Sequence, residues 1–193
     1  MMAHCRNRYD VPTSDAGEDA VSVRDATVAD AAAIQRVRVA AWRAGYAGVV
    51  PEPVLKAMST EVPEHLVHRL ADPPVSCAVY VAETRGRVHG FVNCGPYRID
   101  QDAARRDPGQ GGEIYAIYVD ADHWGSGSGR ALMAAALSHL DGQRLSPVRL
   151  WVLADNPRAR RFYEHRGFTT DGAASPYTVT DGTTLMEVRY RRT

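Results

Sequence analysis

The chain contains few cysteines, and their placement excludes two classes of small protein. Only three occur in 193 residues, Cys5, Cys77 and Cys94. No two of them stand at the short spacing of a zinc ligand pair, and three widely separated cysteines do not make a disulfide framework. We therefore expect neither a disulfide-rich scaffold nor a bound metal.

An excess of one charge and long apolar runs are also lacking. Lysine plus arginine total 23, and aspartate plus glutamate total 23, so nothing indicates a basic surface for nucleic acid or a polybasic patch for a membrane. No segment approaches the ~20 apolar residues of a membrane span, and residues 1–19 are polar, with no apolar run of signal-peptide length,. We expect a cytoplasmic protein that binds neither nucleic acid nor membranes, with a disordered tail over residues 1–19 and one domain over residues 20–193.

A glycine-rich loop is the most informative feature that is present. Glycine and serine alternate from Gly125 to Gly129, and Arg130 follows at the start of an apolar helical stripe. Glycine lets the backbone turn tightly and approach a ligand closely, and the free N–H groups at a helix N-terminus favour an anion. The loop therefore predicts a site where the main chain holds a diphosphate.

Two common phosphate-binding motifs do not fit this loop. A P-loop needs a lysine after its last glycine, and the only lysine in the chain is Lys56. A dinucleotide fingerprint needs glycine or alanine at its sixth place, where this chain has Arg130, or Leu132 when read from Gly127.

The rest of the chain alternates between strand and helix patterns. Strands are expected at residues 20–24, 78–83, 88–93, 114–119 and 148–153 and in a hairpin from 168 to 190, and helices at 30–43, 51–58, 63–70, 132–140 and 157–166,. Residues 99–112 are polar and rich in glycine, and we expect them to form a loop. This order predicts an α/β fold with a mixed central sheet of about six to seven strands, flanked by about four to five helices.

Two motifs together carry a resemblance to a known family. The loop reads Trp124-Gly-Ser-Gly-Ser-Gly129, and a second segment contains Asn156, Ala159, Phe162-Tyr163 and Gly167-Phe168. This resembles the GNAT superfamily of acetyl-CoA-dependent N-acetyltransferases, whose patterns are Arg/Gln-x-x-Gly-x-Gly/Ala and Asn-x-x-Ala-x-x-Phe-Tyr-x-x-x-Gly-Phe. The resemblance covers roughly residues 21–193, and the chain departs from it at Trp124.

The resemblance implies where the cofactor acetyl-CoA would bind. The strands near 114–119 and 148–153 would splay apart, and the pantetheine arm would pair with the backbone of the first strand in the manner of an added strand. The implied cofactor-binding residues are Ile117, Val119, Trp124, Gly125, Ser126, Gly127, Ser128, Gly129, Arg130 and Asn156. No metal is implied.

Two residues are candidates for proton transfer. By the resemblance, Tyr163 is the general acid for the leaving thiolate, and a phenol with a pKa near ~10 is protonated at neutral pH. Glu113, at the head of a strand, matches the place of a general base that often acts through water. Tyr118, His123 or a chain of waters are competing bases. Tyr163 could instead be a core aromatic residue, and Glu113 a solvated charge.

Trp42, Tyr46 and Tyr177 are expected to border the acceptor pocket. No cysteine stands at a marked position in the motifs, which favours direct attack on the thioester in a ternary complex. The expected function is transfer of an acetyl group from acetyl-CoA to a primary amine of an unidentified small molecule or peptide. A non-catalytic acetyl-CoA-binding domain and an acyltransferase for a longer acyl-CoA remain alternatives. A homodimer is also expected, because final hairpins in this fold often pair between subunits.

Overall fold

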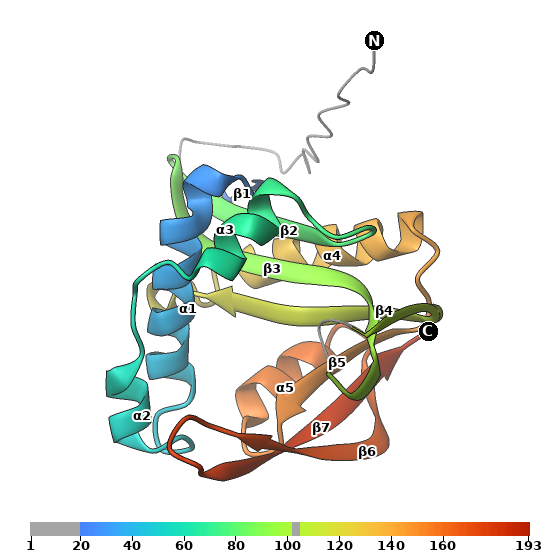
Figure 1. Ribbon diagram of the computed structural model, residues 1–193. Coiled ribbons are helices and arrows are strands. Elements are labelled where there is room, and N and C mark those ends of the chain that lie inside the picture. The colour runs from blue at the N-terminus through green and yellow to red at the C-terminus, as the bar shows by residue number, and fades with distance from the viewer. Residues whose placement is uncertain (1–19, 102–104) are drawn as a thin grey trace.

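One mixed sheet organises the chain (Figure 1). The computed structural model describes residues 20–101 and 105–193, so the expected tail at residues 1–19 lies outside the described residues. The seven strands lie in the order β1-β2-β3-β4-β5-β7-β6. Their bounds are β1 Ser22–Asp25, β2 Ala78–Thr84, β3 Arg87–Arg98, β4 Arg106–Val119, β5 Val148–Leu153, β6 Thr169–Thr178 and β7 Thr184–Arg192. The predicted mixed α/β sheet is confirmed.

Helices cover both faces of the sheet. They are α1 Ala31–Gly45, α2 Glu52–Ala57, α3 Glu64–Ala71, α4 Ser128–Gly142 and α5 Pro157–Glu164. On one face, Ile34 and Val37 of α1 pack against Val81 and Phe91. On the other, the apolar stripe of α4 packs against β2, β3 and β4 around the fully buried Leu132. The helical spacing of these apolar residues explains why each helix buries one side.

The sheet opens in its middle, between the parallel strands β4 and β5. These strands pair at only three positions, from Gly112 with Val148 to Ile114 with Leu150. Beyond them, β4 continues to Val119 and β5 to Leu153 without pairing to each other. In β4, Tyr115 is an extra residue between those that pair with Asn93 and Cys94, and such a bulge bends a strand,. The predicted splay of these two strands is confirmed.

The expectation of a loop over residues 99–112 is wrong for its second half. Residues 106–112 belong to β4, and Asp107 pairs with Tyr97 of β3. The glycines there serve close packing: a Cβ on Gly111 would overlap the Pro147 carbonyl, and one on Gly112 would lie 2.9 Å from the Leu145 carbonyl oxygen. The composition suggested a loop because glycine marks close backbone approach as well as turns.

Candidate active site

A cavity of about 800 Å³ lies where β4 and β5 separate. Its walls are the second half of β4, the loop before α4, the inner side of α5, and parts of α1, α3 and β7. Buried polar atoms that line it without a hydrogen-bond partner in the described chain include Asn93 Oδ1, Trp151 Nε1 and Glu187 Oε2. Because buried polar groups are nearly always satisfied in proteins, these atoms indicate a site for a polar ligand.

The backbone of β4 faces this cavity at the predicted positions. The Asp120 N–H donates to the His89 carbonyl oxygen at 2.8 Å, which directs the preceding Val119 carbonyl away from β3. That carbonyl accepts a hydrogen bond from Trp124 Nε1 at 2.9 Å. Since backbone direction alternates along a strand, Ile117 faces the same way as Val119. Both residues line the cavity and have the geometry for pairing with an extended ligand.

The glycine loop presents backbone N–H groups at the start of a long helix. Gly125 and Gly127 have φ values of 85° and 93°, and Gly127 is the N-cap of the 15-residue α4. Left-handed φ values favour glycine, and the first N–H groups of α4 lack intrahelical partners. Gly129 serves packing, because a Cβ there would lie 3.3 Å from the Phe162 ring. This end of α4 can therefore hold an anion.

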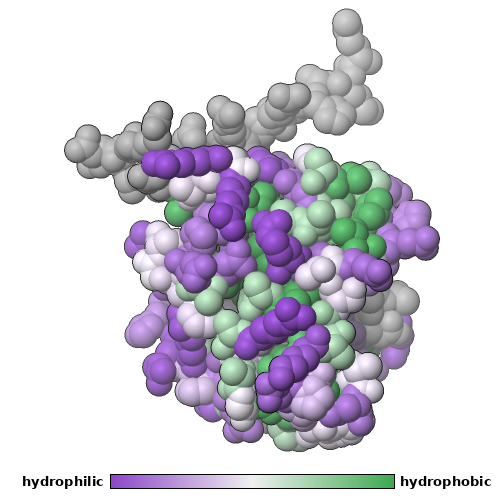
Figure 2. Space-filling view, turned by 90° about the vertical axis from the view of Figure 1, so that its left-hand side faces the viewer, coloured by the Kyte–Doolittle hydropathy of each residue, from purple (hydrophilic) through white to green (hydrophobic). Residues whose placement is uncertain are grey.

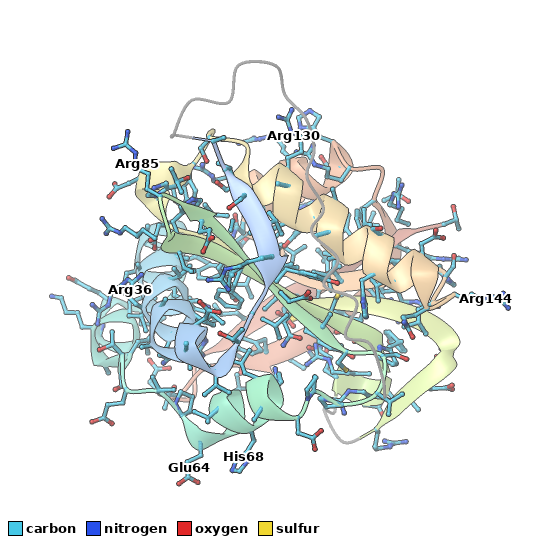
Figure 3. All side chains as sticks on the ribbon, turned by 90° about the horizontal axis from the view of Figure 1, so that it is seen from above. Arg36, Glu64, His68, Arg85, Arg130 and Arg144 are labelled. Atoms are coloured by element: carbon cyan, nitrogen blue, oxygen red, sulfur yellow. The ribbon has the colours of Figure 1, made fainter. Side chains whose placement is uncertain are left out.

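The serine hydroxyls of the loop act within the loop. Ser126 Oγ donates to the His123 carbonyl oxygen at 2.7 Å, and the hydroxyls of Ser126 and Ser128 lie 2.6 Å apart. Ser128 is fully buried. Arg130 is exposed at the N-terminal end of α4, at the rim of the molecule (Figure 3). The loop thus offers main-chain donors, with Arg130 as an outer charge.

Trp124 stands where the resembling family has arginine or glutamine, and a neighbouring residue supplies the charge. The Arg158 guanidinium carbon, in the first turn of α5, lies 3.4 Å from the Trp124 ring centroid. This cation–π stack joins the glycine loop to α5 beside the cavity. Sequence reasoning missed Arg158, because 34 positions separate it from Trp124 (158 minus 124) and no motif links them.

Tyr163 combines a packed ring with an unbonded hydroxyl. Its ring lies 5.4 Å from Phe162, 6.2 Å from Phe168 and 6.5 Å from Tyr190. The residue lines the cavity, and its hydroxyl forms no hydrogen bond to any described residue. Burial raises the pKa of Tyr163, and the Tyr118 phenol adds to this shift. Tyr163 is therefore protonated at neutral pH and can donate.

Asn156 caps the helix that carries Tyr163. Its Oδ1 accepts the Ala159 N–H at 3.0 Å, and Pro157 follows in the first turn. This cap fixes the start of α5, as the sequence suggested. Asn156 also lines the cavity, so its amide nitrogen can meet a ligand while its oxygen holds the helix.

Glu113 is a buried member of an ion pair rather than a solvated charge. It is 0% exposed, and the Arg98 side chain donates to its Oε1 from Nε, at 3.1 Å, and from Nη2. The Arg98 backbone N–H donates to Oε2 at 2.9 Å. Both carboxylate oxygens are thus engaged, and direct proton transfer to Glu113 requires Arg98 to move.

Aromatic side chains surround the end of the cavity nearest α1. Trp42 lies 4.7 Å from Tyr46 and 6.4 Å from Tyr177 between ring centroids. Trp42 Nε1 donates to the Tyr118 hydroxyl at 2.9 Å. Burial raises the pKa of Tyr46, Tyr118 and Tyr177. The structure therefore brings together the three residues predicted to border the acceptor pocket, with Tyr118 beside them.

Comparisons with known proteins identify the family. The family model described as Acetyltransferase (GNAT) family matches residues 38–168. The uncharacterized N-acetyltransferase YuaI of Bacillus subtilis is 32% identical over 139 residues, which are 71% of this chain and 74% of that protein. The chain belongs to the GNAT acetyltransferase family. The resemblance and the prediction of an acetyltransferase are thus confirmed.

Solved structures share the fold of this GNAT protein. The PaiA N-acetyltransferase of Thermoplasma acidophilum, in complex with coenzyme A, has a TM-score of 0.67 and 17% identity, over 90% of this chain and 98% of that one. YncA of Salmonella typhimurium, with acetyl-CoA, has a TM-score of 0.62 and 20% identity, over 90% and 93%. At this identity the likeness shows the fold.

Shorter matches connect this GNAT chain to larger enzymes. The mycothiol acetyltransferase of Kocuria rhizophila is 48% identical over 66 residues, which are 32% of this chain and 22% of that protein. The chain thus spans less than a quarter of that relative. The acceptor is not identified by these comparisons.

Sequence reasoning also missed Glu187, on the fourth position of β7. Its side chain lines the cavity with one buried carboxylate oxygen left without a partner. Burial raises the pKa of Glu187, while the Gln101 side chain and Arg98 act in the opposite direction. Strand alternation was the available signal. Leu185 packs in the same apolar cluster as Trp42 and Tyr177, and Glu187 lies two residues further on the same face of the strand,.

Among residues 20–101 and 105–193, no helix is long and apolar enough to cross a bilayer. The same residues contain no group of three or more His, Cys, Asp or Glu side chains arranged to hold a metal ion. The expectation of a metal-free site stays a prediction.

Proposed function

We propose that the protein binds acetyl-CoA between β4 and β5 and transfers its acetyl group to a primary amine that attacks the thioester directly. One observation carries the proposal. The two strands stop pairing after Ile114 and Leu150, and the opened backbone of β4 leads to the left-handed glycine that caps α4. A chain-like ligand with an anionic end fits this combination of an open strand edge and a helix N-terminus.

Binding would use mostly main-chain atoms. The diphosphate would meet the N–H groups of the glycine loop, and the pantetheine arm would pair with Ile117 and Val119. Trp124 already occupies the Val119 carbonyl, so pairing there requires the indole to move or to share that oxygen. Arg158, stacked on Trp124, would follow the indole and remain near the diphosphate.

The acid that protonates the leaving thiolate would be Tyr163. The phenol hydroxyl is free among the described residues and lies on the cavity wall. The high pKa of Tyr163 favours the protonated form before transfer. Glu113 would act as a charge fixed by Arg98, or as a base through a water molecule after that contact opens.

The cysteines support direct attack rather than an acetyl-cysteine intermediate. Neither Cys77 nor Cys94 is among the described residues that line the cavity. Burial raises the pKa of the Cys94 thiol to about 12, so this sulfur is protonated at neutral pH and is a poor nucleophile. The amine of the acceptor would therefore meet the thioester itself.

Calorimetry with acetyl-CoA tests the cofactor, and initial-rate kinetics with thiol release as readout test the order of events. We expect binding by the wild type and intersecting double-reciprocal plots with a competent amine. Gly127→Val should lose binding, because φ at this position is 93° and a β-branched residue resists it,. No binding at millimolar acetyl-CoA, or parallel plots, would contradict the proposal.

We also retain two proposals from the sequence, a cytoplasmic location and a homodimer through the final hairpin. β6 is one of the two edge strands of the sheet, and residues 169–172 at its start are exposed. Light scattering on the purified protein tests the dimer, and a monomeric mass at micromolar concentration would remove that proposal.

A further inference from the structure

Two carboxylates and one guanidinium share the part of the cavity nearest β7. Arg98 donates three hydrogen bonds to Glu113, two from its guanidinium and one from its backbone N–H. Glu187 keeps a buried oxygen without a partner among the described residues. Arg98 and Glu113 are the charged groups that act on Glu187, with opposite sign. Counting one positive and two negative charges, this group lacks one cation.

Three further arginines, two of the cavity wall and one of β7, face different groups. Arg38 of α1 is exposed, and its charge opposes the rise that burial causes in the pKa of Tyr118 and Tyr177. Arg69 of α3 is influenced by the charges of Arg98 and Arg106, which lower its pKa, and by Cys77 and Tyr115, which raise it. Arg189, two residues after Glu187 on β7, pairs with Asp171 at 2.8 Å. None of the three is among the groups that shift the pKa of Glu187.

Aromatic rings line the same cavity as Glu187. Its charge acts on the phenols of Tyr46 and Tyr177, and both rings contact Trp42. Ring faces attract cations and accept apolar groups. Figure 2 shows purple hydrophilic residues beside green hydrophobic ones on the face that carries α1, and the aromatic rings with the Glu187 carboxylate line the cavity.

We propose that Glu187 binds the acceptor as a primary ammonium ion and takes its proton, and that the acceptor carries an apolar or aromatic substituent and no carboxylate next to the amine. This proposal rests on the proposed function and names the substrate class of the same site. A carboxylate beside the amine would meet Glu187 and Glu113 as like charges. The rings of Trp42, Tyr46 and Tyr177 would hold the apolar part.

The reaction begins with the acceptor as R–NH₃⁺. The Glu187 carboxylate accepts one proton and leaves R–NH₂, whose lone pair forms the N–C bond to the thioester carbonyl carbon. The C–S bond then breaks, and its electron pair stays on sulfur. Tyr163 gives its proton to that thiolate, and the second proton of the nitrogen restores the phenol through solvent. Glu187 releases its proton to water, so the products are the amide, CoA–SH and one proton.

Burial of Glu187 fits the task of a base. A carboxylic acid whose pKa is raised is a stronger base than a solvated one, and catalytic pKa values near the working pH are favourable,. Because the pKa of Glu187 is raised, kcat/KM should fall as the pH falls through that pKa and the carboxylate becomes protonated. Replacement of Glu187 should remove that acidic limb of the profile.

Binding experiments use three probes that share one ring: 2-phenylethylamine, 2-phenylethanol and phenylalanine. Calorimetry is done at pH 7 with saturating CoA. We expect the wild type to bind the amine at least ten times more tightly than the alcohol or the amino acid. Glu187→Gln should remove the preference for the amine over the alcohol. Glu52→Gln, which removes an exposed carboxylate of α2, is the matched control and should keep it.

Kinetics provide the second readout. With 2-phenylethylamine, Glu187→Gln should lower kcat/KM at least a hundredfold at pH 7, with a deficit that shrinks toward pH 10. Affinity for acetyl-CoA should stay within twofold.

The proposal is overturned if the wild type binds none of the probes or prefers the alcohol, or if Glu187→Gln keeps either the preference or the acidic limb. Failure of acetyl-CoA itself to bind would instead remove the proposed function, so the two failures are distinguishable.

Discussion

Replacing Tyr163 by phenylalanine isolates the hydroxyl from the ring. The ring contacts Phe162, Phe168 and Tyr190 in the core, with centroids 5.4–6.5 Å away. The hydroxyl makes no hydrogen bond to the residues of the described ranges, so its removal forfeits no internal bond of the usual ~1 kcal/mol. We expect Tyr163→Phe to unfold at nearly the wild-type denaturant midpoint and to bind acetyl-CoA with nearly wild-type affinity.

Its turnover should fall steeply. General acid catalysis typically contributes a factor of ~10² to 10⁴, which corresponds to about 2.7–5.4 kcal/mol of activation free energy. Thiol release under saturating substrates measures this loss in kcat. The loss should be at least tenfold, even if solvent replaces part of the acid.

Tyr163→Ala is the contrasting variant. It removes the ring as well, and loss of a buried aromatic side chain costs about 3–5 kcal/mol of unfolding free energy. If Tyr163→Phe turned over at the wild-type rate, or if it lost stability as Tyr163→Ala does, the hydroxyl would have a structural role and the proposed acid would be wrong.

Two further substitutions test contacts around the cleft. Trp124→Phe keeps an aromatic face for Arg158 and removes the N–H donor to Val119. Urea denaturation should show a loss of about 1 kcal/mol of unfolding free energy, and calorimetry should show acetyl-CoA binding no weaker than that of the wild type. An unchanged denaturation midpoint would contradict this interpretation. Arg98→Met leaves the buried carboxylate of Glu113 without its ion-pair partner and should cost about 3–5 kcal/mol of unfolding free energy. Adding Glu113→Gln should recover part of that loss. Equal stability of the single and double variants would show that the pair is not coupled.

Local patterns predicted most of the elements that surround the proposed acetyl-CoA cleft. The alternation of glycine and serine before an apolar stripe marked the start of α4, because left-handed φ values and helix caps depend on neighbouring residues,. The apolar runs of β4 and β5 marked two central strands. Asn156 and Pro157 marked the first turn of α5 in the same way.

The proposed acceptor side depends on contacts between distant segments, and local sequence patterns predict little of it. Arg98 reaches Glu113 across two paired strands, and the residue separation of 15 is set by the course of β3 and β4. Arg158 meets Trp124 only because α5 and the glycine loop flank one opening. Glu187 stands in the last predicted strand, between Met186 and Val188, and the sequence does not show whether the face that carries it is buried. Strand alternation places Glu187 on the same face as Leu185, but packing against distant segments decides that this face is buried.

The opening between β4 and β5 also explains an unusual residue of the loop. An unpaired strand edge leaves carbonyl and N–H groups that need partners when water is excluded. The Trp124 indole N–H satisfies the Val119 carbonyl in this structure, while its ring holds the Arg158 guanidinium. A ligand that pairs with the same carbonyl must compete with this hydrogen bond. In the proposed binding mode, Trp124 therefore links the hydrogen bonding of the open cleft to its occupancy. The Arg158 guanidinium stacked on Trp124 supplies a positive charge beside the loop, where the family pattern has arginine or glutamine at position 124.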